Sequence, residues 1–141
     1  MDKYDGGYHL TIFTPPRTKK NHGQLVTLKN GRQMMLPSKA YVAFEKEVVK
    51  FVKEHFPDFK PINEPINFKC LFYKDKNYKA DLTGYLQAIQ DALVKAKFLE
   101  DDNHKIIVST DGSRVLLDRD RPRVEVIIDY LTNEVEQWKK N

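Results

Sequence analysis

The sequence predicts an α+β domain, in which a small mixed β-sheet carries two helices packed on one face. Three observations predict this class. Two stretches, residues 38–56 and 81–97, carry apolar side chains at the spacing of amphipathic helices. Shorter segments rich in β-branched and aromatic residues lie around and between these stretches, as expected of strands. The chain has 141 residues, which fits a single domain over residues 1–141.

The first half of the chain contains a strand and a helix. Residues 1–7 have the composition of a loose start, and residues 8–14 form a strand that two consecutive prolines end. Ser38 is a natural N-cap for the first helix, and Pro57 stops it. The buried stripe predicted for this helix consists of Tyr41, Phe44, Val48, Val52 and Phe56.

Two hairpins are predicted from turn residues. Asn30-Gly31 indicates a tight primed turn, which requires positive φ at both residues. Asp111-Gly112 indicates a second hairpin for the same reason. The paired strands would be residues 24–28 with 33–36, and residues 105–110 with 114–117.

The second half also contains two further strands and the second helix. Residues 66–73 and 124–130 are the strands, and residues 132–141 form a tail or a short helix. The helix over residues 81–97 has one apolar stripe and one polar stripe. The apolar stripe consists of Leu82, Leu86, Ile89 and Leu93, and the polar stripe consists of Thr83, Gln87 and Asp91.

Composition and cysteine usage indicate a soluble protein of a reducing compartment. The single cysteine, Cys70, lies in an apolar run and is expected to be an inert, buried thiol. No apolar run approaches the ~20 residues that span a membrane, and charged residues replace the apolar part of a signal peptide. We therefore expect a cytoplasmic protein without a membrane partner.

Carboxylates lie at both ends of the second predicted helix. Asp81 is at its entrance, and Asp101 and Asp102 are just past its exit. If the next strand runs beside this helix, Asp81 and Asp102 can converge on a hard cation such as Mg²⁺, which prefers oxygen ligands. From spacing alone, a helix cap at Asp81 and an ordinary turn at the acidic pair are the simpler interpretations. Asp91 is expected to be solvated or ion-paired rather than a ligand.

Basic residues gather at three places, although the net charge is only +4. The clusters are Arg17, Lys19 and Lys20; Lys69, Lys74, Lys76 and Lys79; and Arg119, Arg121 and Arg123. A positive surface interrupted by a few carboxylates suits a metal-dependent enzyme that acts on phosphates. Solvated loops are the alternative for each cluster. Glycine-rich phosphate loops, metal-spaced His/Cys clusters and serine nucleophile elbows are absent from the sequence.

The order of these features resembles the RusA family of Holliday junction resolvases, which are small homodimeric Mg²⁺-dependent endonucleases. The resemblance covers most of the chain. Three segments carry it: PPRTKKNHGQ resembles the family's early loop, KADLTGYLQAIQDALVKAKFLEDDN its central helix with acidic ends, and RPRVEVIID its final strand. The combination of these segments is more specific than any one of them.

The resemblance implies a set of site residues. Asp81 and Asp102 correspond to the first and last catalytic aspartates of the family, so they would be the catalytic metal ligands, with Asp101 assisting. Thr83 stands where the family has a further aspartate, and Gln87 stands where it has a helical lysine thought to assist catalysis. A threonine hydroxyl can still bind the metal, but loss of a carboxylate should weaken a divalent site. The two departures lie four residues apart, on one helix face.

Further residues could compensate for these two departures. Asp111 could supply a carboxylate ligand and Arg114 a phosphate contact, although a plain hairpin turn is the simpler interpretation. The DNA contacts implied by the resemblance are Arg17, Lys19, Lys20, Lys76, Lys79 and Arg114. Such phosphate contacts position DNA without reading its sequence.

We therefore expect a Mg²⁺-dependent endodeoxyribonuclease of prophage type, with Mn²⁺ as a possible substitute ion. As a homodimer with two-fold symmetry, it would resolve four-way junctions by paired nicks during DNA recombination and repair. One alternative is a branched-DNA-binding protein of the same fold that has lost the chemistry. A weaker alternative is an α+β domain that binds a protein partner, in which the acidic residues only cap the helix.

Overall fold

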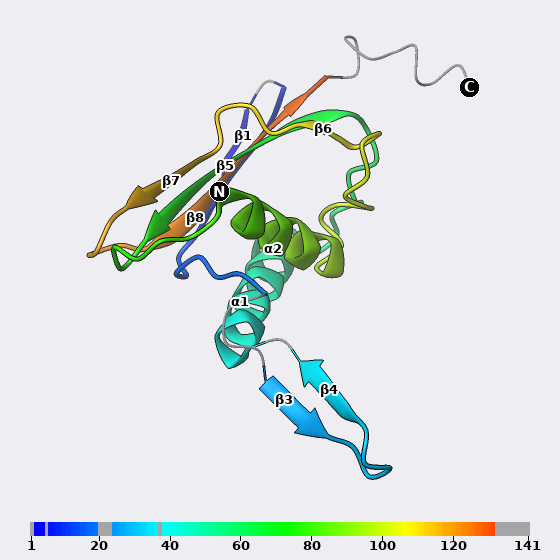
Figure 1. Cartoon of the computed structure of the whole chain (residues 1–141). Coiled ribbons are helices and arrows are strands. Elements are labelled where there is room, and N and C mark those ends of the chain that lie inside the picture. The colour runs from blue at the N-terminus through cyan, green and yellow to red at the C-terminus, as the bar shows by residue number, and fades with distance from the viewer. Residues whose placement is uncertain (1, 5, 20–23, 37, 132–141) are drawn as a thin grey trace.

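A computed structural model describes residues 2–4, 6–19, 24–36 and 38–131 (Figure 1). The strands are β1 (Asp2–Tyr4), β2 (Gly7–Ile12), β3 (Gln24–Thr27), β4 (Gln33–Leu36), β5 (Ile66–Lys74), β6 (Ile107–Ser109), β7 (Arg114–Leu117) and β8 (Arg123–Tyr130). The main sheet has the order β1-β2-β8-β5-β6, and β7 also pairs with β5. Strands β3 and β4 form a separate sheet.

The main sheet is mixed, as the sequence predicts. Strand β8 is antiparallel to both β2 and β5, whereas β6 and β7 run parallel to β5. Burial alternates along β5, because successive side chains point to opposite faces of a strand. The buried face of β5 carries Ile66, Phe68, Cys70 and Phe72.

Helices α1 (Lys39–His55) and α2 (Leu82–Lys95) cover one face of this sheet (Figure 1). The Ser38 hydroxyl caps α1 by accepting the Tyr41 N–H at 3.1 Å. The Tyr85 ring of α2 stacks on Phe72 of β5, with ring centroids 5.2 Å apart. This arrangement confirms the predicted α+β class with both helices on one face.

Helix α2 is slightly shorter than predicted at both ends. At its C-terminus Lys97 adopts a positive φ of 63°. The Lys97 N–H then donates to the Val94 carbonyl, and the Phe98 N–H donates to the Leu93 carbonyl. This is a Schellman motif with lysine in place of the usual glycine. Leu82 is 37% exposed because the first turn of α2 lies at the surface, so its place in the buried stripe was wrong.

The first predicted hairpin is present, but its turn differs from the prediction. Strands β3 and β4 pair antiparallel, with Thr27 opposite Gln33. Of the two turn residues only Gly31 has a positive φ, of 85°, and its N–H donates to the Leu28 carbonyl at 2.9 Å. The connection is therefore longer than a two-residue primed turn, with glycine in the left-handed position that follows a common turn.

The second predicted hairpin is wrong. Gly112 has the expected positive φ of 88°, but the segments on either side pair with β5 and not with each other. The Asn67 side chain of β5 fills the break between β6 and β7. Its Oδ1 accepts the Ser109 hydroxyl at 2.5 Å and the Asp111 N–H at 2.9 Å, and its Nδ2 donates to the Asp111 carbonyl at 3.2 Å. This partner is distant in sequence, so the local turn residues could not predict it.

The N-terminal segment is more regular than the sequence predicted. The sequence predicted a loose start, but β1 pairs with β2. Strand β2 ends at Ile12, two residues before the predicted boundary. The predicted tail at residues 132–141 lies outside the described residues. Among the described helices, none combines the length and apolar character needed to cross a membrane.

Candidate functional site

A cleft of 670 Å³ opens at the N-terminal end of α2. Its side chains offer a carboxylate, hydroxyls, an amide and an ammonium. The lining residues are Thr18, Lys79, Ala80, Asp81, Thr83, Gly84 and Gln87. The structure therefore brings three predicted site residues, Asp81, Thr83 and Gln87, into one cleft with the predicted DNA contact Lys79.

Asp81 occupies the N-cap position of α2 without acting as a side-chain cap. Its backbone is extended, with φ −94° and ψ 127°, and its carbonyl accepts the Tyr85 N–H at 3.2 Å. The Asp81 carboxylate makes no capping hydrogen bond, although an N-cap aspartate commonly accepts an N–H of the first turn. The carboxylate oxygens can therefore accept a ligand in the cleft.

Gly84 allows another segment of chain to pack closely against α2. A side-chain carbon at position 84 would lie 3.3 Å from Thr18 Cγ2, a tight contact. Thr18 belongs to the loop after β2 and forms part of the cleft wall. Thr18 was not predicted from the sequence, although a glycine within a helical pattern can mark such a close approach.

Asp101 and Asp102 lie in the loop after α2, just before the turn at residues 104–106. The Asp101 carboxylate accepts the Asp102 N–H at 2.8 Å and the Asn103 side-chain amide at 3.1 Å. The first of these bonds is the main cause that lowers the pKa of Asp101. Partial burial raises the pKa of Asp102, and hydrogen bonding to Asp101 raises it further. The pKa values of the two adjacent acids therefore shift in opposite directions, and Asp102 binds a proton more strongly than Asp101.

Asp91 is the carboxylate of α2 whose charge also raises the pKa of Asp102. It lies ten residues after Asp81, about 15 Å along a helix axis. In the described part of the chain, no three His, Cys, Asp or Glu side chains lie close enough to hold a metal ion together. The described residues therefore contain no preformed three-acid cluster around Asp81 and Asp102.

A second cleft, of 510 Å³, shares Thr18 and Lys79 with the first. Three of its residues are predicted DNA contacts: Arg17, Lys76 and Lys79. The remaining lining residues are Thr18, Ser38, Ala40, Asp75 and Tyr78. The cations expected to bind phosphates thus lie beside the Asp81 cleft, as a single site acting on DNA would require.

A buried lysine contacts Tyr78 of this second cleft. Lys74 is only 6% exposed, and its ammonium donates to the Tyr78 carbonyl and lies 4.0 Å from the Tyr78 ring centroid. The Tyr85 hydroxyl donates to the Tyr78 hydroxyl at 3.4 Å. Lys74 therefore shapes the loop between β5 and α2 from inside the protein, and it does not belong to the exposed basic surface.

The other predicted site residues lie elsewhere. Lys19 pairs with Asp91, at 2.8 Å between Nζ and Oδ2, so Asp91 is ion-paired as expected. Asp111 lies beside Asn67 near the start of β5, and Arg114 lies opposite Leu71. Neither lines the Asp81 cleft. Lys20 lies outside the described residues.

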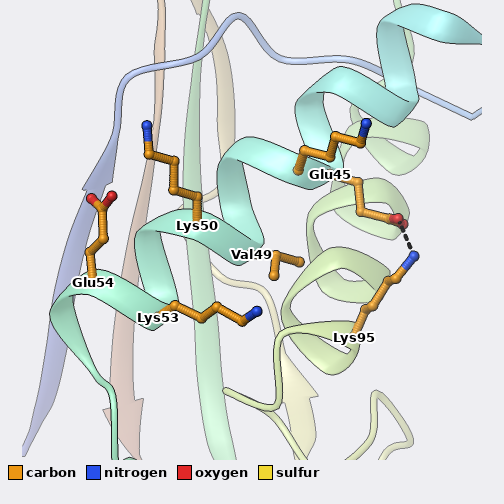
Figure 2. Close-up of a pocket in the computed structure, with 7 residues that line it drawn as sticks. Glu45, Val49, Lys50, Lys53, Glu54 and Lys95 are labelled. Carbon is orange, nitrogen blue, oxygen red and sulfur yellow. Dashed lines mark hydrogen bonds and ion pairs between the residues drawn. The ribbon is translucent and has the colours of Figure 1, made fainter.

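A further hollow of 460 Å³ lies along α1 and shares no lining residue with the Asp81 cleft (Figure 2). Its lining includes Lys46, Lys50 and Lys53 on α1. The Lys95 ammonium of α2 lies 2.6 Å from a Glu45 carboxylate oxygen of α1, so this ion pair joins the two helices. None of the predicted site residues lies in this hollow.

Comparison with known proteins agrees with the resemblance seen in the sequence. No curated protein matches the chain. The family model described as endodeoxyribonuclease RusA matches residues 13–129. This match includes both clefts, all of α1 and α2, and the loop that contains Asp101 and Asp102. The chain therefore belongs to the RusA family of endodeoxyribonucleases.

Proposed function

We propose that this protein is a divalent-metal-dependent endonuclease that resolves four-way DNA junctions by paired nicks. The observation that carries this proposal is the Asp81 carboxylate, which makes no capping bond and lines a cleft beside Lys79. A nuclease of this type needs a carboxylate close to a positively charged surface that holds the DNA backbone. We further propose that it serves DNA recombination and repair in a prophage.

The donor groups in the Asp81 cleft fit a hard divalent ion. The Asp81 carboxylate and the Thr83 hydroxyl are oxygen donors of the kind that Mg²⁺ binds, and Mn²⁺ accepts the same ligands. We assign Asp102 as the second carboxylate ligand, with the Asp101 carboxylate fixing its backbone through the Asp102 N–H. Asp111 is a candidate for an additional acid. When bound, the ion supplies Lewis acidity for phosphodiester hydrolysis.

The basic residues hold and orient the substrate in this proposal. Lys79 lines both clefts, so its ammonium can neutralise a phosphate next to Asp81. Arg17 and Lys76 extend this contact along the DNA backbone from the second cleft. Lys20 and Arg114 are further candidates for backbone contacts. Two copies related by a two-fold axis would place two such sites on opposite strands of a junction.

The first prediction tests Asp81. Asp81→Asn should lower cleavage of a synthetic four-way junction in Mg²⁺ by at least about a hundredfold, because the amide carries no charge for the metal. Junction binding in EDTA should remain, since the cations of the second cleft are unchanged. Gel-based cleavage and binding assays measure both quantities. Asp58→Asn, at an exposed acid before β5, is the matched control, and equal activity of both variants would refute the assignment of Asp81.

The second candidate function is binding of branched DNA without cleavage. Thr83 and Gln87 favour it, because the described residues that line the cleft supply one carboxylate, from Asp81, and one ammonium, from Lys79. A wild-type protein that binds junctions in EDTA but does not cut them in Mg²⁺ or Mn²⁺ would establish this function. Thr83→Asp should then confer metal-dependent cleavage if the missing carboxylate is the cause.

A further inference from the structure

We propose that the Lys19–Asp91 ion pair is a latch that docks residues 17–19 on α2 and so positions one wall of the candidate active site. This inference rests on the proposed function. It makes Lys19 a positioning residue, in place of the phosphate contact that the sequence predicted. Asp91 becomes the acceptor of the latch, with no contact to the substrate.

The Lys19 ammonium is held by groups from both helices. Its Nζ lies 2.8 Å from Asp91 Oδ2 on α2 and 5.5 Å from the ring centroid of Tyr41 on α1. The ring of Tyr41 is almost fully buried, at 2% exposure, so it cannot follow a movement of the loop. The side chains of Lys19 and Asp91 are 42% and 26% exposed, respectively. The latch therefore closes where the loop crosses the two helices.

The latch holds Thr18 against α2. Thr18 lies next to Lys19 in the chain, and its Cγ2 packs on Gly84 so closely that a side-chain carbon there would be 3.3 Å away. Thr18 lines the Asp81 cleft, the second cleft and a smaller recess of 170 Å³ with Lys19, Gly84, Gln87 and Ala88. One residue thus contributes to three hollows beside α2. A shift of the loop would reshape all three.

Arg17 ties the other end of the same short segment. Its Nη1 lies 3.7 Å from Asp75 Oδ1 in the loop between β5 and α2, and it donates to the Pro16 carbonyl at 3.0 Å. Lys19 and Arg17 therefore fasten residues 17–19 to α2 and to the loop between β5 and α2. The Lys19 pair is the closer of the two, so it is the better point at which to break the docking.

Exchanging the charges of Lys19 and Asp91 distinguishes a positioning ion pair from a phosphate contact. Lys19→Met and Asp91→Asn should each lower kcat for junction cleavage about tenfold or more, because small misplacements of an active-site wall are costly. The double variant Lys19→Asp/Asp91→Lys should recover most of that loss, since the ion pair reforms with reversed polarity. A phosphate contact at position 19 could not be recovered in this way, because an acid there repels DNA.

Binding in EDTA provides a second readout. If Lys19 is a latch, the salt dependence of junction binding by Lys19→Met should match that of the wild type. If Lys19 contacts a phosphate, the slope of log K against log salt should fall by about one unit. Lys95→Met is the matched control, because it breaks the Glu45–Lys95 pair between the same helices in a hollow that shares no residue with the Asp81 cleft (Figure 2). Its cleavage should equal that of the wild type.

Limited trypsin digestion tests the latch without any nuclease activity. In Asp91→Asn, which keeps Arg17 and Lys19, the rate of cutting after these residues should rise well above that of wild type and of Lys95→Met. An unchanged digestion rate would overturn the latch. So would a charge-exchange variant that folds but stays inactive, if Lys19→Met also shows the reduced salt slope. If the wild type cuts no junction in Mg²⁺ or Mn²⁺ while the digestion result holds, the cleavage proposal fails and the latch stands.

Discussion

Glu125 is the centre of a network of polar side chains on the sheet face opposite the helices. Its carboxylate lies 2.9 Å from His9 Nε2 and accepts the Arg123 Nε–H at 2.9 Å. Arg123 also donates to Asp118 at 2.9 Å. Burial acts to raise the pKa of Glu125, but the bonds from His9 and Arg123 outweigh burial and lower it. The charged form of Glu125 is therefore favoured in the folded protein.

Glu125→Gln should destabilise the protein at pH 7 by about 1.5–3 kcal/mol, the range for hydrogen bonds to a charged group. The lowered pKa means that Glu125 stabilises the fold above its unfolded pKa, and that this contribution disappears as the pH falls through the folded pKa. The difference from wild type should thus begin to shrink as the pH falls below the unfolded pKa of about 4.3, and it should vanish once the pH is below the folded pKa. Urea unfolding at pH 7 and pH 3 measures it. Glu47→Gln, on an exposed part of α1, should stay within about 0.5 kcal/mol at both pH values.

For single residues, the sequence predicted which side chains meet only where the geometry is local. Asp81, Thr83 and Gln87 reach one cleft because they share the first turns of a single helix. The sequence did not decide whether Asp81 caps the helix, because a cap and a ligand have the same spacing. Thr18 could not be placed from the sequence, because its contact with Gly84 joins segments far apart in the chain.

Helices and strands likewise could be predicted only where consecutive residues specify them. Helix α1 could be predicted because its cap at Ser38 and its buried stripe are both written in consecutive residues. Strands β6 and β7 could not be placed, because Asp111-Gly112 specifies a turn but not the partner of the flanking strands. That partner is β5, and the side chain of Asn67 completes the pairing at the break.

The β3–β4 hairpin is an element that stands apart from the main sheet (Figure 1). Its large apolar side chains are exposed, including Leu25 at 60% and Met35 at 65%. Replacing residues 24–36 by a short glycine-serine linker should therefore change the free energy of unfolding by no more than about 1 kcal/mol, which is the scale of loop-length effects. Thermal and urea unfolding check this. A loss of several kcal/mol would show that the hairpin supports the rest of the fold.

An aromatic cluster joins distant parts of the fold. Tyr8 contacts Phe56, Phe59, Phe98 and Tyr130 edge-on, with ring centroids 5.3–6.4 Å apart. Phe59 and Phe98 stack at 4.6 Å. These rings come from the first and last long strands, from the end of α1 and from the segment after α2. The cluster therefore joins parts of the chain that are distant in sequence.

Phe98→Ala should cost about 3–5 kcal/mol of stability, because Phe98 is fully buried and its removal leaves a cavity in this cluster. Phe13→Ala provides the comparison. Phe13 is 57% exposed and its main contact is the Arg121 guanidinium, 4.8 Å from the ring centroid, so its loss should cost about 1 kcal/mol or less. Denaturant unfolding of both variants measures the difference. Similar losses would place the stabilising contacts outside the cluster.

The break between β6 and β7 also affects how whole molecules meet one another. These segments form the outer edge of the sheet beyond β5, in pieces of three and four residues. A long, continuous edge strand is a template on which another chain can add a strand and start an aggregate. Here the row of outward N–H and C=O groups is interrupted where the chain turns around the Asn67 amide. The broken strand therefore makes this edge of the sheet a poor template for the addition of a strand from another molecule.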